Sequence, residues 1–173
     1  MPYIPPLRDY SPIYIQTASD ASAVNITSTY GVVALSSGYP LTRKRKEPFK
    51  NEWHDQSGDD EYIGATPYYE AFSFTLRCAI FVRAGQTLAT AKQTLKDEVR
   101  AFQNYLFNGG QFKFFDDNTK IGFRNVRVAE FPDPAEDAFS TWNTDARVIF
   151  SVVLKVNDPA TEMILSNGNI VSA

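Results

Sequence analysis

Two adjacent patterns between residues 72 and 106 constrain the fold of this chain more than any other feature of its sequence. In the first, apolar residues occupy every second position on one face, and these are Phe72, Phe74, Leu76, Cys78, Ile80 and Val82. Alternation with a period of two over this length predicts one long β-strand that is buried on one side. Cys78 lies on the buried side, where a thiolate is disfavoured, so the single cysteine is predicted to be a core residue.

In the second pattern the apolar residues recur at steps of three and four, which places them in one stripe along an amphipathic helix. The stripe is formed by Leu88, Ala91, Leu95, Val99, Phe102 and Leu106. Gly109 and Gly110 follow, and glycine readily takes the left-handed conformation that ends many helices. The sequence therefore predicts a helix over about residues 87–107 that packs on the sheet.

Strand-like segments separated by turn residues occupy much of the remaining chain. They cover residues 13–15, 22–27, 32–35, 111–115, 121–130 and 146–156. Because one helix covers only part of such a sheet, we expect the N-terminal strands to form a second sheet over the rest. The predicted fold class is α+β, mainly β: an antiparallel β-sandwich or half-open barrel with one packed amphipathic helix.

The chain has the length of one ordinary domain, and its composition divides it into three segments. Residues 1–12 contain several prolines, which cannot donate ladder hydrogen bonds, and are expected to form an extended N-terminal arm. Residues 13–159 are expected to form a single β domain, whose last strand ends at Asp158 and Pro159. Residues 160–173 are expected to form a mostly polar C-terminal tail.

Residues 40–67 are predicted to leave this domain as a long loop or hairpin excursion, because regular apolar patterning stops there. The excursion opens with four basic residues, which we call the basic block: Arg43, Lys44, Arg45 and Lys46. Acidic residues follow at Asp55, Asp59, Asp60 and Glu61. Opposite charges favour one docking register over others. We therefore interpret the basic block, Trp53, Asp59, Asp60 and Glu61 as a subunit interface, with single-stranded nucleic acid binding or a plain solvated loop as the alternatives.

Charge and composition argue against several classes of function. The chain carries 17 Lys and Arg against 20 Asp and Glu, which argues against a nucleic-acid grip by overall charge. It has no apolar run of the roughly 18 residues that a membrane helix needs, and its first residues lack the pattern of a signal peptide. The sequence shows one histidine, no nucleophile elbow and no phosphate-binding loop. We expect no enzyme, no cofactor and no membrane association.

A partial calcium pattern lies in the acidic part of the excursion. Asp55, Ser57 and Asp59 have the alternating spacing that opens a calcium-binding loop. The sixth position of such a loop would be Asp60 rather than Gly, and the twelfth would be Thr66 rather than Glu. No metal site is predicted from this incomplete match, and Asp55, Ser57 and Asp59 remain weak candidates.

Four segments between Phe72 and Pro159 follow one another in a recognisable order. They are the long strand from Phe72, the helix with its Gly-Gly exit, the strand Phe112-Lys113-Phe114-Phe115-Asp116, and a last strand that ends in Asn157-Asp158-Pro159. This order resembles the distal tail protein and tail-tube group of tailed bacteriophages. The stretch from Trp53 to Tyr62 is also similar to one in small tail proteins of phages or prophages of Bacteroidetes-type hosts.

The resemblance implies a structural subunit of a virion tail or baseplate. Its subunits would close their sheets side by side into a ring, commonly of six, around a lumen that passes DNA as cargo. The implied partners are other copies of the chain and neighbouring tail-tube, baseplate or adaptor proteins, assembled in the cytoplasm of the host bacterium. A tail terminator or head–tail connector of the same virion remains an alternative. So does a monomeric β-sandwich binding module that would use Tyr68, Tyr69 and Trp142.

Overall fold

The structure of the protein is a computed structural model that describes residues 12–51, 60–62, 65–81, 88–132, 139–140 and 147–173. The predicted N-terminal arm at residues 1–12 lies outside these ranges except for Pro12. Several residues singled out from the sequence also lie outside them, namely Trp53, Asp55, Ser57, Asp59 and Trp142.

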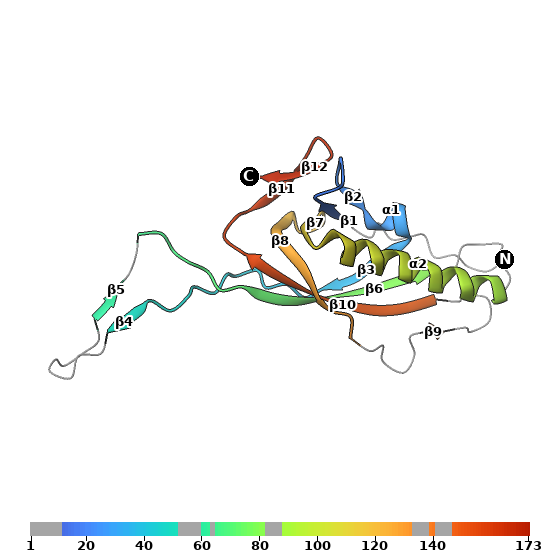
Figure 1. The fold of residues 1–173 in the computed structure, drawn as a ribbon, viewed down its shortest axis with the longest axis horizontal. Coiled ribbons are helices and arrows are strands. Elements are labelled where there is room, and N and C mark those ends of the chain that lie inside the picture. The colour runs from blue at the N-terminus through green and yellow to red at the C-terminus, as the bar shows by residue number, and fades with distance from the viewer. Residues whose placement is uncertain (1–11, 52–59, 63–64, 82–87, 133–138, 141–146) are drawn as a thin grey trace.

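Within the described residues, one antiparallel sheet of eight strands forms the body of the molecule (Figure 1). The strands follow the order β2-β1-β7-β8-β10-β6-β3, and β9 pairs with β10 beside this path. Their bounds are β1 (Ile13–Thr17), β2 (Val24–Asn25), β3 (Val32–Ser37), β6 (Phe72–Phe81), β7 (Gln111–Asp116), β8 (Ile121–Glu130), β9 (Phe139–Ser140) and β10 (Arg147–Asp158). Two further pairs lie apart from this sheet: β4 (Phe49–Asn51) with β5 (Asp60–Tyr62), and β11 (Met163–Ser166) with β12 (Asn169–Ser172).

The centre of the sheet is the long ladder between β6 and β10. It runs from the pair Phe72 and Val156 to the pair Phe81 and Arg147. Phe74, Leu76, Cys78 and Ile80 are buried in the core and Phe72 packs against it, whereas Val82 lies outside the described residues. The prediction of a long strand with a buried cysteine is confirmed.

Helix α2 (Leu88–Gly109) lies across the buried face of this sheet (Figure 1). Its stripe is buried at Leu95, Phe102 and Leu106, and the Phe102 ring meets that of Phe150 on β10 with centroids 6.1 Å apart. Gly110 follows the helix with a φ of 61°, the left-handed conformation expected at a helix end. The predicted helix over residues 87–107 is confirmed.

The sheet curls so strongly that strands far apart in its order come into contact. Three strands separate β3 from β7, so a flat sheet would hold them about 19 Å apart. Yet the Tyr39 hydroxyl, just after β3, donates a hydrogen bond to Oδ2 of Asp116 at the end of β7, at 2.7 Å. The half-open barrel therefore describes this sheet.

A short helix, α1 (Ile26–Tyr30), bridges the open side of the half-barrel between β1 and β3 and also contacts α2. The prediction of a strand over residues 22–27 is wrong from residue 26 onward. The Asn25 side chain accepts hydrogen bonds from the backbone N–H groups of Thr27 and Ser28 and so starts a helix, and Gly31 ends it with a φ of 68°. Only β2 remains of the predicted strand.

Residues 163–172, expected to be part of a polar tail, form the β11–β12 hairpin on the opposite face of the sheet. Its Met163 and Ile170 are buried against Phe115 of β7, in a small second core. The turn consists of Asn167 and Gly168, which have φ values of 49° and 75°. These two positive φ values match a two-residue hairpin turn, for which Asn-Gly is a strongly preferred sequence.

The predicted fold class, α+β and mainly β, is confirmed. The expectation of a separate N-terminal sheet is wrong, because β1 pairs with β7 and β3 pairs with β6. These pairings satisfy backbone donors and acceptors that would otherwise lie open along the edges of the sheet. The two helices and the C-terminal hairpin take the covering role instead.

Candidate functional site

The most distinctive surface of the molecule is a two-stranded ribbon that continues one edge of the sheet. β3 and β6 pair as far as Ser37 and Leu76. Farther out, Arg45 lies opposite Tyr69, and β4 then pairs with β5. These pairings make the predicted excursion a hairpin, which we call the arm, and Figure 1 shows it extending away from the sheet. Extended chain from Ser37 to Asn51 spans about 45 Å, so the arm can reach beyond its own domain.

The basic block forms one strand of this arm. The backbone N–H of Lys46 donates to the carbonyl of Tyr68 at 2.8 Å, and that of Glu70 donates to the carbonyl of Lys44 at 2.8 Å. A short ribbon of this kind has a free backbone edge on each side, and charged side chains on an edge strand discourage unspecific strand addition. The charges of the basic block can therefore protect the arm as well as direct its docking.

Two side chains of the basic block contact their own chain. Lys44 Nζ lies 3.0 Å from Glu70 Oε2, and this hydrogen bond and the carboxylate charge raise the pKa of Lys44. The guanidinium of Arg43 lies over the ring of Tyr69, 5.7 Å from its centroid. All four residues of the basic block are exposed. Because Arg43 and Lys44 already contact Tyr69 and Glu70, we take Arg45 and Lys46 as the pair that a partner would meet.

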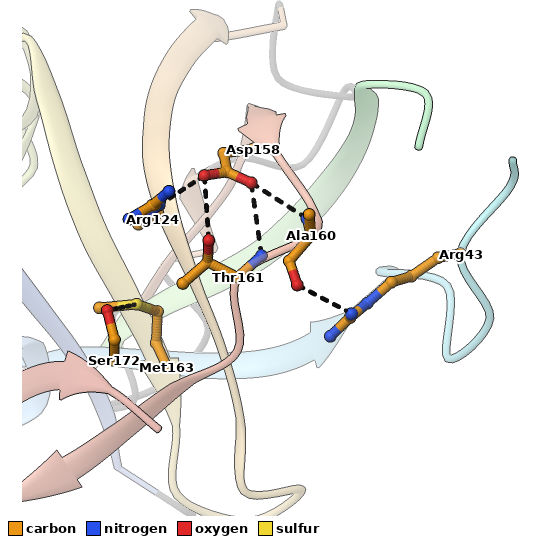
Figure 2. A network of polar contacts seen from close by, with 7 residues as sticks. All are labelled: Arg43, Arg124, Asp158, Ala160, Thr161, Met163 and Ser172. Carbon is orange, nitrogen blue, oxygen red and sulfur yellow. Dashed lines mark hydrogen bonds and ion pairs between the residues drawn. The ribbon is translucent and has the colours of Figure 1, made fainter. Parts of the chain in front are cut away.

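Arg43 also ties the base of the arm to the chain that follows β10 (Figure 2). Its Nη1 donates to the carbonyl of Ala160 at 3.0 Å. Asp158 accepts hydrogen bonds from the backbone N–H groups of Ala160 and Thr161 and pairs with Arg124. Burial raises the pKa of Asp158, but these hydrogen bonds and the Arg124 charge outweigh it and hold that pKa below its ordinary value. The arm is thus fixed to the turn that leads into the C-terminal hairpin.

Two large apolar side chains flank the basic block and face solvent. Leu41 is 79% exposed and Tyr68 is 70% exposed. Apolar surface rimmed by polar residues marks an interaction site where it forms a contiguous patch, so these two side chains are candidates for the apolar part of a docking surface. Tyr69, by contrast, is half-buried beneath Arg43, so the Tyr68 and Tyr69 of the binding-module alternative do not form an open aromatic pair.

The acidic limb of the predicted interface is described only in part. In β5, Asp60 lies opposite Asn51 and Glu61 opposite Lys50. Trp53 and Asp59 lie outside the described residues, as do the calcium candidates Asp55 and Ser57. The structure brings the basic block together with Glu70, an acidic residue outside the predicted interface. The contact of Arg43 with Ala160 was also missed, because it joins segments more than a hundred residues apart.

The buried titratable groups of the body take part in structural contacts. Burial raises the pKa of Cys78 to about 12, so its thiol stays protonated. Asp116 accepts hydrogen bonds from Tyr39, Ser37 and the backbone of Asn118. The described ranges contain no group of three or more His, Cys, Asp or Glu side chains placed to hold a metal ion. In the same ranges, no helix has both the length and the apolar character needed to span a membrane.

Among known protein families none matches this sequence, and no curated protein matches it. Its fold is similar to that of a chain in the structure of the phage p2 baseplate in its activated conformation with Sr. The two chains share 10% sequence identity and superpose with a TM-score of 0.50. The match covers 84% of this chain and 44% of the baseplate chain, so this chain spans less than half the length of its structural neighbour. The similarity is one of fold.

Proposed function

We propose that this chain is a structural subunit of a bacteriophage tail or baseplate and that it assembles with copies of itself into a ring. The observation that carries the proposal is the arm, a ribbon about 45 Å long that projects from a domain whose fold is similar to that of a phage p2 baseplate chain. A ribbon that leaves its own domain gains little buried surface there. A neighbouring subunit would supply that surface and stabilise the arm.

A ring of six around a DNA-passing lumen is the arrangement that we propose, with neighbouring tail-tube, baseplate or adaptor proteins above and below. A tail-tube or distal-tail position suits this arrangement, and the particle would be assembled in the bacterial cytoplasm. Head-to-tail contact between an arm and a different surface of the next subunit is a heterologous interface, which closes into a ring when the rotation permits. The chain has no assigned chemistry in this role, in keeping with the structural use of its buried polar groups.

The test compares the full chain with a variant whose outer arm is removed. Because Arg45 lies opposite Tyr69, a two-residue Asn-Gly turn can replace residues 46–68 and still join the two strands. This variant keeps Tyr39 in the core and the Lys44–Glu70 pair at the base of the arm.

Light scattering over a range of concentrations, with negative-stain images of large species, should show rings or stacked rings for the full chain. The shortened variant should stay monomeric, with an unchanged circular dichroism spectrum. Equal assembly of both chains would contradict the role of the arm, and a full chain that is monomeric at every concentration would contradict the ring. Stacked rings would favour a tube position over a terminal one.

A further inference from the structure

A second exposed aromatic surface lies on the body, where the C-terminal end of α2 meets β8. The Phe107 ring is 60% exposed and packs against Phe131, with centroids 5.3 Å apart. An open pocket beside Phe107 is lined by Leu106, Phe107, Gly110, Gln111, Arg127 and Val128. We call Phe107, Phe131, Gln111 and Arg127 the aromatic patch.

Phe131 of the aromatic patch packs against the main core, but Phe107 is not needed to cover it. The buried stripe of α2 ends at Leu106, so Phe107 is the next residue and points away from that stripe. A phenylalanine that stays largely in contact with water loses the favourable free energy that its burial would give. Aromatic residues and arginine are also the types most enriched in the centres of protein interfaces. The composition of the patch therefore fits a docking surface.

We propose that the aromatic patch receives the outer arm of a second copy of this chain. The proposal rests on the proposed function and adds the surface on which the arm docks. Between Phe49 and Tyr62 the outer arm contains three aromatic residues, Phe49, Trp53 and Tyr62. In the same stretch the acidic residues outnumber the one lysine, Lys50, and are Glu52, Asp55, Asp59, Asp60 and Glu61.

The charges of the patch complement those of the outer arm. Arg127 is exposed within the patch, and Arg100 is exposed two turns earlier on α2. Within the patch itself Arg127 is the charged member, and Glu130, three residues farther along β8, is exposed as well. An aromatic and acidic arm on an aromatic and basic patch pairs apolar surface with apolar surface and opposite charges with each other.

The arm that docks must come from another copy. The arm of each chain is rooted on β3 and β6 and extends away from the body (Figure 1). The patch instead consists of residues from α2, β7 and β8, with Phe131 just after β8. Each chain would then dock its arm on one neighbour and receive the arm of another neighbour on the aromatic patch, which is a different surface. This relation between neighbours is the heterologous contact that can close a ring.

The first test is disulfide formation between two different single-cysteine variants. Equal amounts of the Glu61→Cys and Gln111→Cys chains are mixed and oxidised, and covalent dimers are counted on non-reducing gels. The native Cys78 is buried, with a raised pKa, and does not compete. The matched control replaces Gln111→Cys with Val171→Cys, an exposed residue on the C-terminal hairpin.

We expect covalent dimers in the Gln111→Cys mixture at a level at least about tenfold above the Val171→Cys control. If the chain still forms rings but the Gln111→Cys mixture cross-links no more than the Val171→Cys control, or does not cross-link at all, the aromatic patch does not receive the arm. The proposed function would then still stand. A chain that is monomeric by light scattering at every concentration would overturn both.

The second test uses a charge exchange. Arg127→Glu and Phe107→Ser should each raise the concentration at which the chain assembles by about tenfold or more, because both residues lie at the contact. In the docked arrangement that we propose, Glu61 of one copy faces Arg127 of the next. Combining Arg127→Glu with Glu61→Arg should therefore restore most of the loss, because an ion pair with exchanged signs can form there. Rescue excludes a mere folding defect. Normal assembly of Arg127→Glu alone, or a loss that Glu61→Arg does not restore, would count against the proposal.

Discussion

The Tyr39 hydroxyl donates a hydrogen bond to Oδ2 of Asp116 at 2.7 Å, and this contact joins the root of the arm to the far side of the half-barrel. Asp116 is only 5% exposed, and Tyr39 also bonds to the hydroxyl of Thr119 in the β7–β8 turn. The arm leaves the body just beyond Tyr39. Its direction is therefore set by a buried polar contact as well as by strand pairing.

Replacing Tyr39 with phenylalanine should destabilise the fold without opening its core. The ring would still pack edge-on against Phe74 and Phe123, whose centroids lie 5.5 Å and 5.6 Å from its own. The buried Asp116 carboxyl would lose one donor, which costs about 1–3 kcal/mol. Urea unfolding measures this loss.

Tyr14→Phe is the matched control, because Tyr14 is a half-buried tyrosine on β1 that packs on the smaller core. It should change the free energy of unfolding by less than about 0.5 kcal/mol. Equal losses for the two variants would show that the hydroxyl of Tyr39 contributes nothing specific.

Acid should weaken the contact that holds α2 to the turn after β1. Asp20 Oδ2 accepts hydrogen bonds from the Tyr105 hydroxyl and from the backbone and side chain of Thr17. Burial raises the pKa of Asp20, but these hydrogen bonds outweigh it and leave the pKa below its ordinary value of 3.8. A lowered pKa in the folded state means that the unfolded chain binds the proton more readily. The stabilisation is then complete above the ordinary pKa and is lost as the pH falls through the folded-state value.

Asp20→Asn tests this pH dependence. At neutral pH the variant should be less stable than the native chain, and the difference should shrink steadily below about pH 4. Thermal unfolding at a series of pH values gives the comparison, with Asp97→Asn on the exposed face of α2 as the control. A difference that stays constant down to about pH 2 would contradict the lowered pKa.

The regular patterns of the sequence predicted the elements whose side chains meet one common core. β6 and α2 are both long and strictly periodic, so each one specifies its buried face by itself. The pairing of β1 and β3 with opposite ends of the same sheet is set by contacts between distant segments, and local pattern carries no information about it. The same is true of the contact between Tyr39 and Asp116.

Two errors came from turn chemistry that the sequence does contain. Asn25 followed by Gly31 marks the start and end of a short helix, and Asn167-Gly168 between apolar residues marks a hairpin. For the candidate site, the basic block was recognised as an isolated run of charge. Its pairing with Glu70 and Ala160 depends on the ribbon register and on the fold, which charge patterning cannot supply.

Adding a side chain at Gly122 should loosen the C-terminal hairpin. A Cβ there would lie 2.7 Å from the Met163 carbonyl oxygen and 2.9 Å from the Phe115 ring. Both neighbours are held in the small core, so the hairpin must shift, and such overpacking costs about 1–3 kcal/mol.

Hydrogen exchange locates this effect. Gly122→Ala should speed amide exchange in residues 163–172 much more than in β6 and β10. Gly38→Ala is the control, because its Cβ would lie 3.4 Å from the Thr75 carbonyl oxygen, at ordinary contact distance. Uniform acceleration across the whole sheet would mean that the hairpin is not a separate packing unit.

The basic block should divide into a structural pair and an assembly pair. Lys44 is matched by Glu70 within its own chain, so exchanging them as Lys44→Glu with Glu70→Lys keeps an ion pair in the arm. Arg45 and Lys46 are exposed, and reversing them as Arg45→Glu with Lys46→Glu changes the charge that a neighbour would meet. We expect the first double variant to assemble like the native chain and the second to remain monomeric, with both showing native circular dichroism. Light scattering at matched concentration and salt distinguishes them.

Because charges that dock on a partner are screened by salt, the native chain should also assemble less readily as ionic strength rises. Normal assembly of the second variant would instead assign the whole basic block to protection of the free edge of the arm.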